Sequence, residues 1–222
     1  MSYWERVRPV RRARAVDIGE VARASVRLLD EGGLGVLTVR AVAAQIAVAP
    51  ASLYSRVESV EDLFDLALDA ALGEDAEVQR ALDADVRDSR VRGVGAQESG
   101  VFEDLMLALY RHLVRHRWAP QILVRRAPRG PHYLRFSERM CVLLEKEGAV
   151  DPLGSAYTAS NFVIGSAATA PMLSDERAAP IDADVAPLYA RLHAGHRADP
   201  EVLVVQGLAS LRRRASAGAD RG

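Results

Sequence analysis

The chain has 222 residues, 49% of them hydrophobic, and its 29 basic and 30 acidic residues leave a formal net charge of -1. That length is enough for one or two compact domains with a buried core. The near-neutral total argues against a protein coated with positive charge, and the ordinary hydrophobic fraction argues against a disordered acidic chain. Cys141 is the single cysteine, which excludes an internal disulfide and a cysteine metal cluster. No stretch reaches the roughly 18 apolar residues that cross a bilayer, so we expect a soluble, cytoplasmic protein without a membrane partner.

The charge is unevenly distributed along the chain. Residues 1–16 contain five arginines and one acidic residue, Glu5. Residues 1–60 contain nine arginines and six acidic residues, so residues 61–222 carry a net charge of -4. The sequence therefore predicts a basic head, beginning with a basic flexible arm over residues 1–16, and an acidic body.

Helical patterns begin at Asp17. Apolar residues recur at three- and four-residue spacing from Ile18 to Leu29, as on one face of an amphipathic helix. Asp17 can cap this helix, and Gly32 with Gly33 can end it.

Shorter helices follow. Thr38 can cap one of them, and Pro50 suits the first position of the next. Ser59 and Asp62 resemble a capping box that opens a longer helix. The predicted elements of this region are helices over about 38–46, 50–57 and 59–72.

The remainder of the chain is predicted to be helical as well. Pro120 breaks one of its helices, and the helix after Asp151 is small or apolar on nearly all sides, which is typical of a helix buried on most faces. No period-two pattern of a strand occurs, so the fold class is all-α. We predict helices over about 101–117, 122–126, 133–148, 151–170 and 200–214, a charged stretch at 73–100 and an acidic, proline-bearing loop at 171–187.

The two short helices have the dimensions of a helix-turn-helix unit. Leu53 and Val57 of the second helix turn toward the core, while polar and small residues face outward. Such residues at a helix N-terminus can contact phosphates and base edges in a major groove, and Arg40 can reach the flanking DNA backbone. The outward-facing residues of the second helix are Ala51, Ser52, Tyr54, Ser55 and Arg56.

This region resembles the N-terminal domain of TetR-family transcriptional repressors. The resemblance is carried by LGVLTVRAVA at 34–43, Val48, LYSRV at 53–57 and EDL at 61–63. It implies a DNA-binding domain at 17–58 and a larger helical effector-binding and dimerisation domain at 59–222. It also implies that certain residues lie at or near DNA, with Tyr54 on a phosphate; these are Thr38, Arg40, Pro50, Ser52, Tyr54 and Arg56.

Three positions depart from the family pattern. Ala47 stands where the turn residue is usually glycine, at a cost of about 1 kcal/mol if it is left-handed. Ala49 cannot cap its helix, and Val60 replaces a lysine that grips phosphate. Losing one phosphate contact should lower the salt dependence of DNA binding by about one unit of slope. The arginines of the arm can compensate on phosphates or in the minor groove, and a solvated tail is an equal alternative.

For the body, the resemblance implies that an effector binds among the helices, moves the fourth helix and changes the spacing of two recognition helices. The helices near 151–170 and 200–214 are the candidates for a four-helix homodimer interface, so that each subunit reads one half-site of double-stranded operator DNA. Individually, aromatic and sulfur-bearing residues at helical spacing are more often plain core than ligand contacts. The candidates to line a pocket for a small apolar or aromatic effector are Phe102, Met106, Tyr110, His116, Trp118, Phe136, Met140, Asn161 and Phe162.

Other classes of function fit less well. His112 and His116 have the spacing of metal ligands, but no glutamate lies between them and no obvious third ligand accompanies them, so we expect a packed or half-exposed pair and no metal. The sequence has no glycine-rich phosphate loop, nucleophile elbow or carboxylate cluster, so we expect neither an enzyme nor a cofactor. A helical small-molecule carrier that does not bind DNA is the remaining alternative, because Ala49 and Val60 weaken two DNA contacts. That alternative gives no reason for the polar outward face behind a basic arm, so we expect a ligand-responsive repressor.

Overall fold

The computed structural model describes residues 2–6, 16–84, 100–196 and 199–217. All regular structure within these ranges is helical, as the sequence predicts, and none of the described helices is long and apolar enough to cross a membrane. The helices are α1 (Tyr3–Arg6), α2 (Ile18–Gly32), α3 (Val39–Gln45), α4 (Pro50–Tyr54), α5 (Val60–Glu74), α6 (Ala76–Asp83), α7 (Val101–Arg115), α8 (Ala119–Leu123), α9 (Pro131–Lys146), α10 (Pro152–Thr169), α11 (Leu173–Ala178), α12 (Pro187–Gly195) and α13 (Pro200–Ala217), with 3₁₀ turns at Leu34–Val36 and Ala170–Met172.

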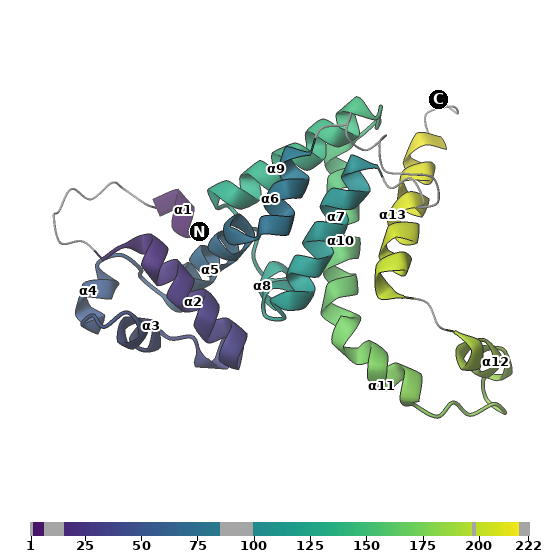
Figure 1. The fold of residues 1–222 in the computed structure, drawn as a ribbon, viewed down its shortest axis with the longest axis horizontal. Coiled ribbons are helices and arrows are strands. Elements are labelled where there is room, and N and C mark those ends of the chain that lie inside the picture. The colour runs from purple at the N-terminus through teal and green to yellow at the C-terminus, as the bar shows by residue number, and fades with distance from the viewer. Residues whose placement is uncertain (1, 7–15, 85–99, 197–198, 218–222) are drawn as a thin grey trace.

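The helices form two groups that α5 connects (Figure 1). Helices α2, α3 and α4 lie together at one end of the molecule; we call them the N-terminal bundle. Helices α6 to α10 and α13 form the larger group, which we call the body. Helix α5 packs against α2 on one side and α9 on the other, so it belongs to both groups. Helix α11 continues from the lower end of α10, and α12 lies beyond it, on the side away from the N-terminal bundle (Figure 1).

The helix ends of the N-terminal bundle follow from local chemistry. The carboxylate of Asp17 accepts a hydrogen bond from the Gly19 N–H (3.0 Å), and the Thr38 hydroxyl accepts one from the Ala41 N–H (3.0 Å). Gly33 has a φ of 69°, and its N–H bonds the Leu29 carbonyl, so it ends α2 in a conformation that glycine tolerates well. These caps and this stop were all predicted from the sequence.

Several boundaries differ from the predicted ones. Helix α4 ends at Tyr54 rather than Val57, because the N–H groups of Arg56 and Val57 both bond back to the Leu53 carbonyl in a closing turn. The predicted capping box is wrong in its bonds: the Ser59 side chain caps nothing, and Asp62 accepts from the Glu58 N–H (2.7 Å).

Three differences occur in the body. The short helix predicted over 122–126 is α8, which begins at Ala119; Pro120 lies in its first turn, where a proline needs no N–H partner and does not break the helix. The stretch at 171–187, predicted as a loop, contains α11, which continues the chain after α10 through a 3₁₀ turn. The last helix extends to Ala217 instead of 214.

The first residues of the chain form α1, which packs on α5. The Tyr3 N–H donates to Asp65 (2.8 Å), and Arg6 forms ion pairs with Glu58 and Asp62. Tyr3 is buried. These residues therefore differ from the flexible arm predicted over 1–16, because buried carboxylates of α5 bind them. Arg8, Arg11, Arg12 and Arg14, the other arginines of that arm, lie outside the described residues.

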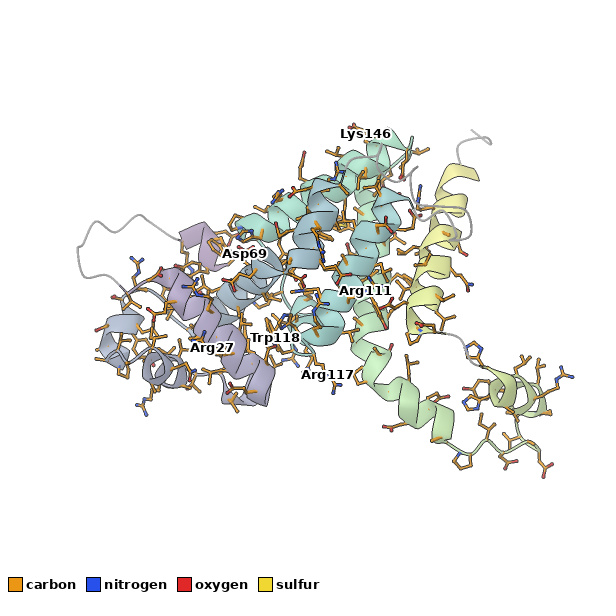
Figure 2. The ribbon with its side chains drawn as sticks, viewed as in Figure 1. Arg27, Asp69, Arg111, Arg117, Trp118 and Lys146 are labelled. Atoms are coloured by element: carbon orange, nitrogen blue, oxygen red, sulfur yellow. The ribbon has the colours of Figure 1, made fainter. Side chains whose placement is uncertain are left out.

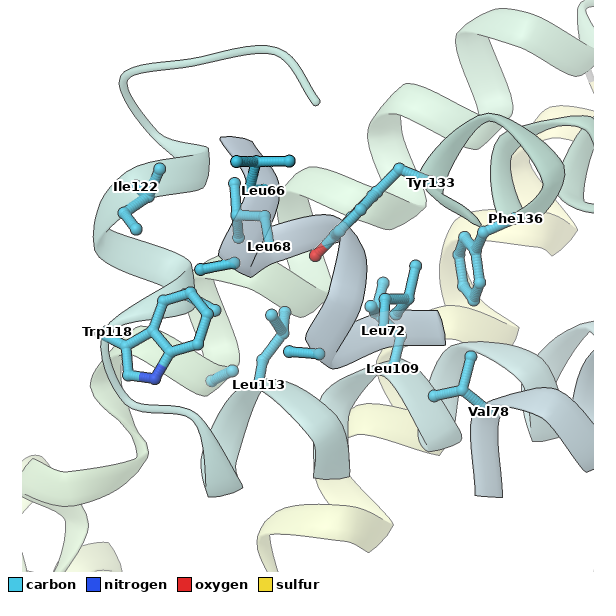
Figure 3. Close-up of a cluster of buried hydrophobic side chains, with 14 of the residues drawn as sticks. Leu66, Leu68, Leu72, Val78, Leu109, Leu113, Trp118, Ile122, Tyr133 and Phe136 are labelled. Atoms are coloured by element: carbon cyan, nitrogen blue, oxygen red, sulfur yellow. The ribbon is translucent and has the colours of Figure 1, made fainter. Parts of the chain in front are cut away.

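The core lies where α5, α7, α8 and α9 meet (Figure 3). Trp118 and Ile122 from the α8 region face leucines of α5 and α7, and Tyr133 and Phe136 of α9 close the other side. The Tyr133 hydroxyl is buried without a hydrogen-bond partner in the described structure, and burial raises its pKa far above the ordinary value. This dense packing fixes the position of α5 relative to the body.

Candidate functional site

The α3–turn–α4 unit has the geometry of a helix-turn-helix. The Val48 N–H donates to the Ala43 carbonyl (2.9 Å), which closes the turn. Ala47 has a φ of 54°, so the alanine adopts the left-handed conformation that glycine usually supplies here. The turn therefore contains a left-handed alanine, which adds strain. The Ala49 side chain does not cap α4, as the sequence predicts.

The predicted DNA-facing residues lie mostly at the surface. Leu53 and Val57 are buried and anchor α4 and the turn after it in the N-terminal bundle. Tyr54 is 53% exposed, and the Ser55 hydroxyl bonds the Ser52 carbonyl (2.7 Å). The exposed members of the predicted set are Thr38, Arg40, Pro50, Ala51, Ser52, Tyr54 and Ser55.

Arg56 is the exception in this set. It is half-buried, and its Nε is buried without an acceptor in the described part of the chain. Tyr3 lies close enough that the charge of Arg56 lowers the pKa of the Tyr3 hydroxyl, although burial raises it by more. Arg56 therefore lies between the DNA-facing side of α4 and the docked α1, rather than fully outward.

Three buried aspartates of α5 hold neighbouring segments. Asp62 binds Arg6 of α1 and the Glu58 N–H, and Asp65 accepts from the Tyr3 N–H and from Arg126 (3.0 and 2.9 Å). Arg126 follows α8, so Asp65 links the docked N-terminus to the segment between α8 and α9. We call Asp62, Asp65 and Asp69 the α5 carboxylates.

Asp69 caps a helix from outside it. Its Oδ1 accepts from the N–H groups of His132 (2.9 Å) and Tyr133 (3.0 Å) in the first turn of α9. Figure 2 shows Asp69 where α5 meets α9. Burial raises the pKa of Asp69, and the two N–H bonds lower it only in part. A Cβ at Gly130 would overlap the Asp69 carboxyl group, so this approach requires glycine there.

A second junction joins α2 directly to the body. Asp30, at the end of α2, lies 2.7 Å from His116 Nδ1 and accepts from the Trp118 indole N–H (2.6 Å). Both partners belong to the turn between α7 and α8. A displacement of this turn would therefore be transmitted to the N-terminal bundle without passing through α5.

The predicted histidine pair is divided between two carboxylates. His112 is completely buried, and its Nδ1 lies 2.8 Å from Asp75, while His116 bonds Asp30. Burial lowers the pKa of His112, and its bond to Asp75 offsets this only in part. The described residues contain no group of three or more histidine, cysteine, aspartate or glutamate side chains placed to hold a metal ion.

The predicted effector residues are spread over the body rather than gathered in one cavity. Most of them are buried in the core, His116 and Phe162 are half-buried, and Asn161 is exposed on α10. Phe102 lines a cavity of about 420 Å³ beside α10, and His116 lines a separate pocket beside α5 and α6. The buried members are Phe102, Met106, Tyr110, Trp118, Phe136 and Met140.

The cavity lined by Phe102 lies between α10 and α13; we call it the α10–α13 cavity. Its apolar wall includes Leu144, Leu208 and Leu211, and its polar groups include Glu147 and Arg212. None of these residues was predicted from the sequence, because Arg212 meets partners that lie far away in the chain. For the docked N-terminus a signal was available: Tyr3 and Trp4 are apolar aromatic residues at the start of an otherwise charged arm.

Comparison with known proteins agrees with this geometry. Residues 100–194 match the family model described as the tetracyclin repressor-like, C-terminal domain. A protein named HTH-type transcriptional regulator from Saccharopolyspora erythraea is 32% identical over 149 residues, which cover 66% of this chain and 58% of that protein. The HTH-type transcriptional repressor DrrR1 from Streptomyces coeruleorubidus is 32% identical over 154 residues, covering 68% of this chain and 52% of that protein. The matched regions thus span little more than half the length of these relatives.

A solved structure has the same fold. The Streptomyces coelicolor TetR family protein ActR in complex with actinorhodin aligns with a TM-score of 0.68 and 22% sequence identity, over 93% of this chain and 99% of that one. These sequence matches, together with the helix-turn-helix before the matched C-terminal domain, define the class that this chain resembles: it is similar to transcriptional regulators of the TetR family.

Proposed function

We propose that the protein is a ligand-responsive, DNA-binding transcriptional repressor that leaves its operator when an effector binds the body. The observation that carries this proposal is the exposed polar face of the α3–turn–α4 unit, with Tyr54, Ser52 and Arg40 at the surface above a buried Leu53. A carrier would have no use for this face. The named repressor among the relatives and the actinorhodin held by ActR support both parts of the proposal.

We further propose that the protein acts as a homodimer in the cytoplasm, with α10 and α13 of each subunit forming the interface. These helices expose large apolar side chains that a monomer leaves in water, including Tyr157 (63% exposed), Leu153 and Leu203. Two such pairs of helices, related by a two-fold axis, bury one another in a four-helix arrangement. Each subunit then presents one α4 to one half-site of the operator.

DNA binding can be tested with fragments that flank the protein's own gene, in a gel-shift assay at about 50 mM salt. Tyr54→Ala should weaken binding about tenfold, because it removes a phosphate contact worth about 1.4 kcal/mol. Tyr189→Ala is the matched control, since Tyr189 is 50% exposed but lies on α12. The control should bind as the wild type does. If no flanking fragment shifts, the carrier alternative replaces the repressor.

A further inference from the structure

The α10–α13 cavity lies next to a point where α10 and α13 touch. A Cβ at Gly207 of α13 would overlap the ring of Phe162 on α10, so the glycine allows the two helices to touch. The cavity is lined by earlier residues of α10, such as Thr158, and by later residues of α13, such as Leu211. Its volume of about 420 Å³ falls within the range of about 300–1,000 Å³ that is typical of small-molecule sites.

The charged groups at this cavity are unequal in number. Arg212 pairs with Glu103, pairs with Glu147 (2.6 Å) and lies 5.8 Å from the centre of the Phe102 ring. Glu103 is 5% exposed, and its Oε2 is buried without a hydrogen-bond partner in the described structure. Asp151 also lines the cavity, and its Oδ1 caps α10 at the Gly154 N–H (2.9 Å). Among the described residues, the carboxylates of Glu147 and Asp151 and the guanidinium of Arg212 line the cavity, and Glu103, outside this lining, pairs with the same guanidinium.

Such an imbalance favours a positively charged ligand. Burial raises the pKa of Glu147, the charge of Glu103 raises it further, and Arg212 lowers it, so the Glu147 carboxylate is incompletely compensated. An incoming ammonium group would supply the missing positive charge and hydrogen-bond donors. An anionic ligand would have to displace carboxylates from Arg212 and would meet their repulsion.

We propose that the α10–α13 cavity binds a cationic amphiphile, with its ammonium group at Glu147 and Asp151 and its apolar body along Leu144, Leu208 and Leu211. The proposal rests on the proposed function, because such a ligand would be an effector of the repressor. It assigns the effector a place and a chemical class. Of the residues predicted from the sequence to line the effector pocket, Phe102 alone lines this cavity.

The test compares three probes of one shape by isothermal titration calorimetry on the full-length protein. They are 1-naphthalenemethylamine, which is a cation at neutral pH, the neutral 1-naphthalenemethanol and the anionic 1-naphthoate. We expect the amine to bind about tenfold more tightly than the alcohol, and the anion to bind most weakly. Glu147→Gln should reduce the affinity for the amine to about that for the alcohol and leave the alcohol unchanged.

Glu145→Gln is the matched control, because it removes the same charge two residues earlier, in the last turn of α9, at a residue that does not line the cavity. Thr158→Trp should fill the cavity from an exposed position and abolish binding of both the amine and the alcohol. Thermal melting of each variant checks that it is folded. The proposal is overturned if the anion binds as well as the amine, if the two glutamine variants lose affinity equally, or if no probe binds.

The gel-shift assay separates this result from the proposed function. A protein that shifts its flanking DNA but binds no probe retains the repressor function and loses the proposed site. A protein that binds the amine in the expected order but shifts no DNA retains the site and loses the repressor function.

Discussion

Ala47 is a single strained residue in the α3–turn–α4 unit. Its φ of 54° places a Cβ in a conformation that costs about 1 kcal/mol and that glycine adopts without penalty. Ala47→Gly should therefore raise the free energy of unfolding by about 0.5–1 kcal/mol. Urea unfolding followed by circular dichroism measures this change.

Ala44→Gly provides the opposite control for Ala47→Gly. Ala44 is exposed within α3, where glycine should lower the stability by about 0.5–1 kcal/mol. If both substitutions destabilise the protein, Ala47 is not strained in solution.

His112 should make the stability depend on pH. Burial holds the pKa of its ring below that of an unfolded histidine, about 6.5, against the opposing pull of Asp75. His116 and Arg115 lie nearby and also disfavour the charged ring. The unfolded chain then takes up a proton that the folded chain does not, so this contribution to stability is present above about pH 6.5 and is lost as the pH falls.

The measurement is the free energy of unfolding in urea between about pH 7.5 and about pH 5.5. The wild type should lose more stability over this range than His112→Gln does. His132→Gln, at an exposed histidine, should behave as the wild type does. Parallel curves for wild type and His112→Gln would contradict the prediction.

At the scale of the element, the packing of α1 on α5 gives Arg6 a structural role that the exposed Arg40 does not have. Arg6 is engaged by Glu58 and Asp62, and Asp62 is buried, so Arg6→Ala leaves a carboxylate without its cation. The expected cost is about 1–3 kcal/mol of unfolding free energy. Arg40 is exposed in α3, so Arg40→Ala should change the stability by less than about 0.5 kcal/mol and weaken DNA binding instead.

Chemical denaturation and the gel-shift assay, run on both variants, give the two readouts. Equal losses of stability would show that α1 does not dock in solution. Two roles remain open for the arginines between Arg6 and Asp17, which are contacts with phosphate or the minor groove and a solvated tail. If they contact DNA, deleting residues 7–15 should reduce the salt slope of binding; an unchanged slope would favour the solvated tail.

Elements were predictable where local chemistry decides them. Asp17, Thr38 and Gly33 define helix ends through contacts with residues at most four positions away, so a single sequence reveals them. The docking of α1 and the charges around Arg212 depend on partners more than fifty residues away, for which one sequence carries no periodic signal. The effector residues were harder to place for a related reason: aromatic side chains that fill a core and those that line a cavity share the same helical spacing.

At the scale of the whole molecule, dimer formation should depend on the faces of α10 and α13. Leu203 is 39% exposed on α13, so Leu203→Glu should convert the proposed dimer to a monomer by placing a charge in its interface. Leu134→Glu is the control, since Leu134 is 49% exposed on α9. Size-exclusion chromatography with light scattering gives the mass of each variant. A dimeric Leu203→Glu protein would place the interface elsewhere.

The α5 carboxylates limit how the α3–turn–α4 unit could be isolated from the rest of the protein. A fragment that ends with α5 would retain Asp65 and Asp69 but would lose Arg126 and the first turn of α9, which bind them. It would also expose the leucines of α5 that the body covers. Two charges and an apolar surface would be left without their partners, so the helix-turn-helix of this protein is not a transferable module. Grafting its DNA specificity onto another protein requires moving residues of α3 and α4 into a related scaffold, rather than cutting the chain after Glu74.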